Sequence, residues 1–360
     1  EPCQLTVEGS DGPTSARLIW LHASDDLYWA DVSPASDAGL YLLAEAEGPE
    51  LVVVRLGPAL EHEWSLALAH EAESAGFGPF TVGPAGFDLV SRATRAGDST
   101  SWLTHVDDAG RCSDSTQLVL GGDTAPNVQS LVRDGERLVV GGIAYPDRAF
   151  VQSRSASDAV VAETELLVEW GYIQAFSLYR GGPKRYLAHY QAYAPQGFWS
   201  NYFGNVWLDE ALTSPSPVTG GDAGFDLLSY QSDADGRLYS VVRDAWDFES
   251  PDTPPPTSLS VTRQASETSP SGEPRELMVP QPDCGSLSVR VRDEALQVVH
   301  CNADESLLGY ASAGAPTWTA TLACPSAAAL QLGRMHFDAA GRSWSLGSVE
   351  GEGVLVLLEW

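Results

Sequence analysis

The chain alternates short apolar runs with turns rich in Gly, Pro, Asp and Ser, a pattern typical of β-strands joined by tight turns. A second strand is expected after the run that opens each unit, for example at Leu138–Val140 and Leu238–Val241. The rhythm predicts an all-β chain built from repeated units. From residue 85 the opening runs lie near Phe87, Val128, Phe176, Phe225, Leu287 and Leu330, at separations of 41, 48, 49, 62 and 45 residues.

One short phrase occurs twice. Residues 85–91 read Ala-Gly-Phe-Asp-Leu-Val-Ser, and residues 223–229 repeat them with one change, 138 residues or three periods of 46 later. We expect each copy to open the inner strand of its unit, with the glycine at a tight start and the phenylalanine packed between neighbouring units. The aspartates Asp88 and Asp226 are candidate ligand-binding residues, which either satisfy loop backbone amides or face a central channel.

The N-terminal part has the size of one propeller blade. Residues 17–32 resemble a hairpin around a Ser-Asp-Asp turn, and Leu40–Ala44 and Leu51–Leu56 follow as strands. The chain ends in an apolar strand, Val354–Trp360, which needs a partner because a bare sheet edge invites aggregation. We therefore predict one β-propeller domain over residues 1–360, whose ring is closed by its N- and C-terminal strands. A period of about 48 residues gives seven four-stranded blades, with six or eight as alternatives.

One segment carries a resemblance to a known family. Leu27-Tyr28-Trp29-Ala30-Asp31, followed by Gly39-Leu40-Tyr41, resembles the repeat of YWTD-type β-propellers. The resemblance covers about fifteen residues. It implies the propeller fold and a binding role, and it assigns no functional residue.

Two segments interrupt the rhythm. Residues 57–76 fit a helix through Leu60, Trp64 and Leu68, or a strand through alternation of Trp64, Leu66 and Leu68, and the β-rich surroundings favour the strand. Residues 248–283 contain eight of the 23 prolines. We interpret this second segment as an exposed loop inserted within a blade, where a strand at 258–262 is possible.

The charge excludes several classes of partner. The chain has 49 acidic and 20 basic residues, a net charge of −29, so it lacks the basic footprint of a nucleic-acid-binding protein. Anionic membrane surfaces are disfavoured for the same reason, and no apolar run is long enough for a membrane span. Solubility or a salty medium explains the acidity more simply than a cationic partner does.

The cysteines and the first residues favour an exported protein. Five cysteines contain no Cys-x-x-Cys pair, which argues against zinc and redox sites, and three of them lie within 41 residues near the C-terminus, as one local disulfide would require. The chain opens Glu-Pro-Cys without an initiator Met, as a processed or trimmed chain would. We expect an extracellular, periplasmic or cell-surface location, and the sequence leaves the oligomeric state open.

Acidic turns provide the only cofactor signal. Asp233 and Asp235 precede Gly236 as a fragment of a calcium loop, but the third acid is absent. Turn formation accounts for them, because Asp starts a type I turn and Gly accepts a positive φ. The same form recurs at Asp107–Arg111 and Asp338–Arg342. We expect no cofactor, with a calcium ion as the weak alternative, and the scattered histidines form no metal-binding motif.

Aromatic side chains are densest over residues 186–207, where they alternate with Gln and Asn. Rings beside amide groups suit sugars, whose C–H faces stack on aromatics while their hydroxyls bind amides. Filling the space between blades is the alternative role of these rings. The candidate ligand-binding residues here are Tyr190, Tyr193, Trp199, Tyr202 and Trp207.

No catalytic motif is present, so no catalytic residue is assigned. The first hypothesis is an exported, non-enzymatic binding protein that recognises a carbohydrate or protein partner through loops on one face. The alternatives are a hydrolase or lyase with its site in the central channel, and a structural cell-surface protein.

Overall fold

The computed structural model describes residues 4–9, 12–21, 27–113, 115–145, 148–167, 172–181, 185–193, 201–212, 219–222, 227–232, 238–243, 258–263, 275–278, 287–292, 295–301, 306–310, 317–323, 330–337, 341–349 and 352–359. Within these ranges the chain forms 29 strands and no helix. The predicted all-β class is therefore confirmed.

The strands pair antiparallel in seven sheets. We number the sheets in chain order from β3, and the first strands of sheets 1 to 7 are β3, β7, β11, β15, β19, β23 and β27. Strands β1 and β2, from the start of the chain, join the opposite edges of sheets 6 and 7. Sheet 1 contains β3 (Leu27–Pro34), β4 (Leu40–Ala46), β5 (Glu50–Leu56) and β6 (His62–Ala69). Sheet 2 contains β7 (Ser74–Gly83), β8 (Gly86–Arg95), β9 (Asp98–Asp107) and β10 (Thr116–Gln117). Sheet 3 contains β11 (Asn127–Asp134), β12 (Arg137–Tyr145), β13 (Arg148–Arg154) and β14 (Val160–Leu167).

The remaining sheets follow the same order. Sheet 4 contains β15 (Tyr172–Arg180), β16 (Arg185–Tyr193), β17 (Asn201–Asp209) and β18 (Thr219–Asp222). Sheet 5 contains β19 (Leu227–Ser232), β20 (Leu238–Arg243), β21 (Ser258–Arg263) and β22 (Arg275–Met278). Sheet 6 contains β23 (Leu287–Arg292), β24 (Ala295–Cys301), β25 (Ser306–Tyr310), β26 (Trp318–Ala323) and β1 (Gln4–Gly9). Sheet 7 contains β27 (Leu330–Phe337), β28 (Arg342–Val349), β29 (Glu352–Glu359) and β2 (Ser15–Leu21).

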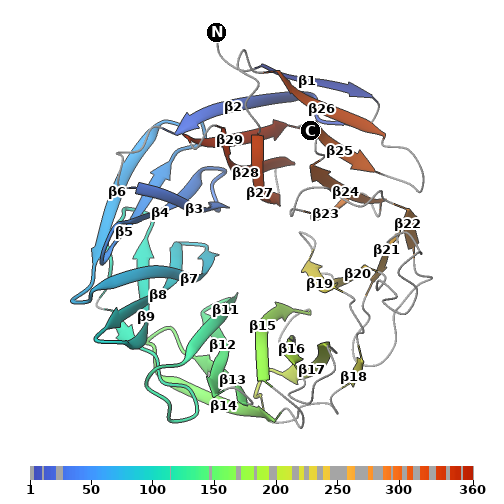
Figure 1. Cartoon of the computed structure of the whole chain (residues 1–360). Coiled ribbons are helices and arrows are strands. Elements are labelled where there is room, and N and C mark those ends of the chain that lie inside the picture. Colours follow the sequence, from blue (N-terminus) through green and yellow to red (C-terminus); the bar gives the residue numbers. More distant parts are fainter. Residues whose placement is uncertain are drawn as a thin grey trace.

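The sheets are arranged around a common centre in chain order, as in a propeller (Figure 1). The first strand of each sheet lies closest to the centre, and first strands of successive sheets touch: β3 with β7, β7 with β11, β11 with β15, β15 with β19, β23 with β27, and β27 with β3. The C-terminal ends of first strands from different sheets can therefore form one site.

The N-terminal segment pairs with the last strand of the chain, as predicted. Strand β2 runs antiparallel to β29, from Ser15 opposite Glu359 to Leu21 opposite Gly353. The expected hairpin over residues 17–32 is wrong, because β2 belongs to sheet 7 and β3 pairs with β4 in sheet 1. The cause is long-range: residues 354–358 of β29 are buried, so the strand needs a neighbour on each side, and β2 supplies the second.

The apolar core lies between sheets. Between sheets 1 and 2, Tyr41 and Val53 pack against Phe87 and Leu89, and the Tyr41 and Phe87 ring centroids lie 4.7 Å apart. Phe87 thus packs between neighbouring sheets as predicted, and burial of such a ring contributes about 1.5–3 kcal/mol to stability. Gly86 forms the expected tight start, with a φ of 129°.

The prediction that Gly86 and Phe87 open the first strand of their unit is wrong by one strand. Gly86 and Phe87 open β8, the second strand of sheet 2, whereas β7 (Ser74–Gly83) is the first. The opening runs near Val128, Phe176, Leu287 and Leu330 do lie on first strands. Glycines and aromatics interrupt the aliphatic pattern of β7, which hides this strand in the sequence. Residues 223–226, including Phe225 and Asp226 of the second copy, lie outside the described residues.

The ambiguous segments are strands where they are described. Residues 57–76 contain β6, in which Trp64, Leu66 and Leu68 alternate toward the core between sheets 1 and 2. Within residues 248–283 the strands β21 and β22 complete sheet 5, and the strand considered at 258–262 is present. The other residues of that proline-rich segment lie outside the described ones.

The acidic turns have the expected chemistry where they are described. In the turn after β9, Asp107 Oδ1 accepts hydrogen bonds from the backbone N–H groups of Ala109 (3.0 Å) and Arg111 (2.9 Å). Gly110 has a φ of 74°, the left-handed region that glycine adopts without steric strain. Residues 233–237, which hold the calcium-loop fragment, lie outside the described residues.

Candidate functional site

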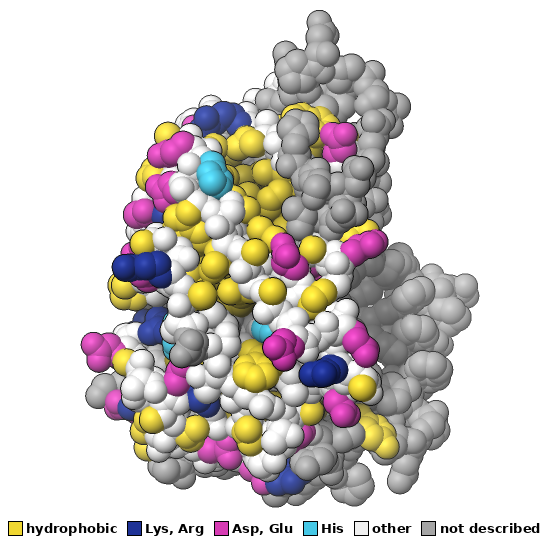
Figure 2. All heavy atoms as spheres, turned by 90° about the vertical axis from the view of Figure 1, so that its left-hand side faces the viewer, with side chains coloured by type: hydrophobic (Ala, Val, Ile, Leu, Met, Phe, Trp, Pro, Cys, Tyr) yellow, Lys and Arg dark blue, Asp and Glu magenta, His cyan; other side chains and the backbone are white. Residues whose placement is uncertain are grey.

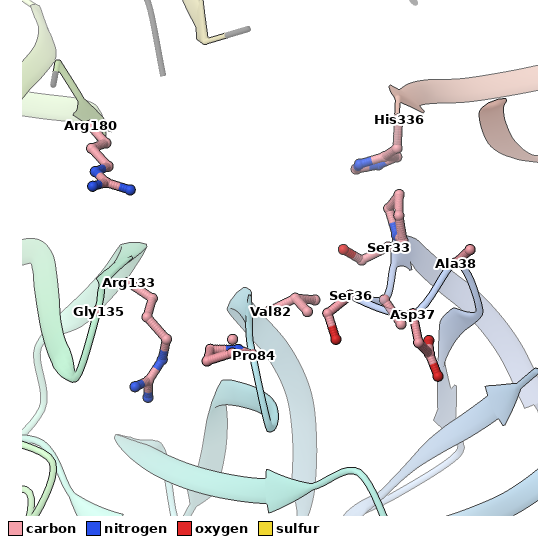
Figure 3. A pocket seen from close by; sticks show the side chains of 13 residues that line it. Ser33, Ser36, Asp37, Ala38, Val82, Pro84, Arg133, Gly135, Arg180 and His336 are labelled. Carbon is pink, nitrogen blue, oxygen red and sulfur yellow. The ribbon is translucent and has the colours of Figure 1, made fainter. Parts of the chain in front are cut away.

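A cavity of about 880 Å³ opens where the first strands of five sheets end (Figure 3). Its walls come from the C-terminal ends of β3, β7, β11, β15 and β27 and from the turns that follow β3, β7 and β11. Among the described residues, the lining mixes small or apolar residues with six polar side chains, which are Arg133, Arg180, His336, Ser33, Ser36 and Asp37.

Arg180 and His336 face each other across this cavity. Figure 3 shows them on opposite sides, with both side chains directed toward the space between, and the Ser33 hydroxyl also points into it. Arg180, 44% exposed, forms an ion pair with Asp134 in which Nη2 lies 2.8 Å from Oδ1. His336 Nε2 lies 3.3 Å from Asp31 Oδ1. Arg180 can therefore donate hydrogen bonds to a ligand in the cavity, and the His336 ring is a second polar group beside it.

Asp134 is held by a second group. The Tyr186 hydroxyl donates to its Oδ2 over 3.1 Å, and the Asp134 side chain is only 14% exposed. Burial raises the pKa of Tyr186 to about 12, so its hydroxyl keeps its proton and remains a donor. The ion pair between Asp134 and Arg180 is thereby fixed at the end of β15.

Arg133 is fixed through the buried carboxylate of Asp88. The Arg133 Nε donates to Asp88 Oδ2 over 2.5 Å, and the Asp88 side chain is 2% exposed. Asp88 Oδ1 contacts His105 Nδ1, and His105 Nε2 lies 2.8 Å from Asp158 Oδ1. The hydrogen bond to Asp88 is the main cause that raises the pKa of His105; burial opposes it and Asp158 adds to it. This network joins sheets 2 and 3 beside the cavity.

Asp37, the acidic side chain among the described lining residues, is paired with a buried arginine that also contacts Glu63. Arg55 is 2% exposed and its Nη2 lies 2.5 Å from Asp37 Oδ1, while its Nη1 donates to the carbonyl of Leu56 over 2.9 Å. Burial alone would raise the pKa of Asp37, but the hydrogen bonds from Arg55 and from Gly39 N–H outweigh it and lower the pKa. Figure 3 shows the Asp37 carboxylate turned away from the middle of the cavity.

The predicted site residues do not gather at this cavity. Asp88 lies beside it but is buried, and it binds side chains rather than loop amides or the channel. Tyr190 is 6% exposed and belongs to the core of sheets 3 and 4, as the space-filling role of these aromatics requires. Trp207 is half-buried and packs against Gly181 and the cluster around Tyr230.

The other predicted residues stay predictions. Tyr193 and Tyr202 lie on the paired strands β16 and β17, but their side chains are outside the described part of the structure. Trp199 and Asp226 lie outside the described residues altogether. Sugar stacking on these aromatics is therefore neither supported nor contradicted.

The sequence analysis missed Arg133, Arg180 and His336. A local signal was present, because each lies at or near the end of a first strand and shortly before a glycine in the sequence: Arg133-Asp-Gly, Arg180-Gly-Gly, and His336 ahead of Asp338-Ala-Ala-Gly341. A search for basic residues at the ends of the first strands, just before a glycine-containing segment, would have identified all three. Their convergence could be recognised only with the correct phase of the units.

The described residues give no sign of a metal site or a membrane-spanning helix. No group of three or more His, Cys, Asp or Glu side chains is arranged there to hold a metal ion. Cys112 is free and exposed, and the predicted local disulfide stays a prediction. None of the described segments is a helix with the length and apolar character needed to cross a membrane.

The surface of one side of the ring carries acidic side chains spread over it, with fewer basic ones among them (Figure 2). They form no single block in this view, in keeping with a general solvating role for the charge. The cluster of Arg133, Arg180 and His336 therefore differs from the predominantly acidic character of the chain.

Two solved structures share the overall fold. A complex of KlAtg21 with the coiled-coil of AgAtg16 gives a TM-score of 0.54 at 10% identity, covering 89% of this chain and 94% of that chain. The polysaccharide lyase Uly1 gives a TM-score of 0.52 at 10% identity, covering 92% and 91%. No protein-family model and no curated protein matches the sequence, so the resemblance to YWTD repeats has no family match behind it. At these identities the similarity shows an all-β, propeller-like fold shared along most of the chain.

Proposed function

We propose that this chain is an exported seven-bladed β-propeller that binds a carbohydrate in the cavity at the ends of its first strands. Seven sheets in chain order support the blade number, and the pairing of β2 with β29 supports closure of the ring by the two ends of the chain. The observation that carries the binding role is the cavity itself, to which five sheets contribute.

The size and lining of the cavity favour a small polar ligand. Its volume of about 880 Å³ falls within the range of about 300–1,000 Å³ that small-molecule sites occupy. Serine, arginine and histidine side chains offer several hydrogen bonds, which suits a molecule with many hydroxyl groups. Protein interfaces instead centre on apolar or aromatic anchors, and none of the described lining residues is Phe, Tyr or Trp.

Blocking the cavity tests this proposal. Ser33→Trp places a large ring where the serine hydroxyl points, so we expect it to abolish binding on a glycan array and by isothermal titration calorimetry. Glu47→Trp adds the same ring at an exposed position in the turn after β4, and should bind as wild type does. Thermal unfolding of both variants shows whether the fold is kept.

The array also separates the rival hypotheses. Loss of binding in Trp199→Ala, with Ser33→Trp unaffected, would move the site to the aromatic stretch. A wild-type protein that binds no glycan would contradict the proposal and leave a protein partner or a structural role.

One observation favours an enzymatic alternative. His336 lies 3.3 Å from Asp31 at the cavity wall, and an imidazole held by a carboxylate is a common arrangement for a general base. A hydrolase or lyase would release new chain ends from a polysaccharide. Reducing-end assays on any glycan that binds should then show turnover that His336→Gln abolishes while binding persists.

A further inference from the structure

We infer that the sugar bound in this cavity is acidic, with a carboxylate or sulfate group held between Arg180 and His336. The inference rests on the proposed function and names its ligand class. Its basis is the direction of the side chains: the chain carries a net charge of −29, yet among the described lining residues Arg180 and His336 point into the cavity, while the carboxylates paired with them, Asp134 and Asp31, are not among those lining residues.

The Asp37 carboxylate in the lining does not face an anion in the middle of the cavity. Buried Arg55 already pairs with Asp37, whose carboxylate turns away from the middle of the cavity. Arg180 and His336, in contrast, direct their side chains into the space between them. An incoming anion therefore meets the Arg180 guanidinium, with the His336 ring opposite it.

The ion pair with Asp134 holds Arg180 in place and leaves other N–H groups of its guanidinium available to a ligand. Its ion pair with Asp134 uses Nη2, and a guanidinium has five N–H donors in a rigid planar fork. Asp134 is itself fixed by Tyr186, so the guanidinium is positioned before a ligand arrives. A planar carboxylate or a sulfate is the group that such a fork binds best, because two parallel hydrogen bonds can form.

The overall acidity does not prevent this binding. At physiological ionic strength, interactions between exposed charges decay over about 8 Å, so distant carboxylates hardly affect an anion in the cavity. The groups at the cavity wall decide: Arg180 and Arg133 are each oriented by one carboxylate, Asp134 and Asp88 respectively, and both arginines line the cavity. The same screening predicts that affinity falls as salt is added.

Matched pairs of saccharides test the inference. Isothermal titration calorimetry with trigalacturonate and its methyl ester compares a carboxylate with its uncharged form, and sulfated and desulfated galactan oligosaccharides do the same for sulfate. A glycan array with further acidic and neutral pairs widens the search. We expect the acidic member of at least one pair to bind about tenfold or more tightly than its neutral partner.

Three variants locate the effect. Arg180→Gln and His336→Gln should each weaken binding of the acidic member by about tenfold or more and leave the neutral member nearly unchanged. Arg95→Gln removes an exposed arginine at the last residue of β8, at the opposite end of this strand from the cavity, and should change nothing. Thermal unfolding confirms that each variant is folded.

The outcomes are distinct. Preference for the uronate pair or for the sulfated pair supports the inference and identifies the acidic group. Equal affinity for acidic and neutral members, unchanged in Arg180→Gln, would overturn it while the proposed carbohydrate binding stands. If no saccharide binds at all, the proposed function fails, and the inference fails with it.

Discussion

The carboxylate of Asp88 holds the guanidinium of Arg133, with Nε donating to Oδ2 over 2.5 Å, and this contact joins the second strand of sheet 2 to the first strand of sheet 3. Asp88 belongs to the phrase that occurs twice in the sequence. Its role is to fix a basic side chain in the wall of the cavity, and the same carboxylate contacts His105.

Asp88→Asn should destabilise the protein by about 3–5 kcal/mol, because it leaves the Arg133 charge without its partner in a largely buried place. Urea unfolding measures the change. Asp98→Asn, at the exposed first residue of β9, is the matched control and should shift the free energy of unfolding by less than about 0.5 kcal/mol. Equal effects of the two variants would contradict a structural role for the contact.

His105 should make stability depend on pH. Because the pKa of His105 is raised in the folded state, protonated His105 stabilises the fold. This contribution is fully present below the ordinary pKa of 6.5 and is lost as the pH rises through the higher folded value. The charged groups facing His105 are Asp88 and Asp158, with Arg133 on the far side of Asp88.

The His105→Gln variant tests this dependence. Urea unfolding of wild type and variant across pH 5–9 should show the stability difference shrinking as the pH rises. NMR titration of the His105 ring measures its pKa directly. A stability difference that grows toward alkaline pH would have the wrong sign for this contact.

Gly86→Ala should be strongly destabilising. A Cβ at this position would lie 2.0 Å from the carbonyl oxygen of Val106, and the φ of 129° is already unfavourable for other residues. We expect a loss of more than about 3 kcal/mol. Gly97 also has a positive φ, 88°, but nothing lies within 4 Å of its added Cβ, so Gly97→Ala should cost only about 1 kcal/mol. Chemical denaturation of both variants separates the clash from the backbone strain.

Phe87→Ala should cost about 3–5 kcal/mol, because it empties the contact between sheets 1 and 2. The ring lies 4.7 Å from that of Tyr41 and 5.0 Å from that of Phe80. Tyr28 is 61% exposed, so Tyr28→Ala should change stability by less than about 0.5 kcal/mol. Differential scanning calorimetry compares them, and a Phe87 variant as stable as wild type would show that sheets 1 and 2 are held together elsewhere.

Local properties could be predicted from the sequence because they depend on neighbouring residues. Alternation of Trp64, Leu66 and Leu68 identified β6, and the Asp107–Gly110 turn has the predicted hydrogen bonds and positive φ. The second strands at Leu138–Val140 and Leu238–Val241 lie where the rhythm placed them. Side-chain spacing and turn stereochemistry depend on only a few consecutive residues, so they can be predicted from the sequence alone.

Only the tertiary structure decided which strands pair and which side chains meet. The sequence pattern predicted that β2 pairs with β3, but β2 pairs with the buried strand β29 at the other end of the chain. The phase of sheet 2 was hidden for the same reason, since a strand's place in its sheet depends on neighbours distant in sequence. Arg133, Arg180 and His336 are far apart along the chain and converge because five first strands end around one cavity. The sequence by itself determined strands and turns. The arrangement of the sheets around a common centre depends on contacts between residues far apart in the chain, and it produced the site.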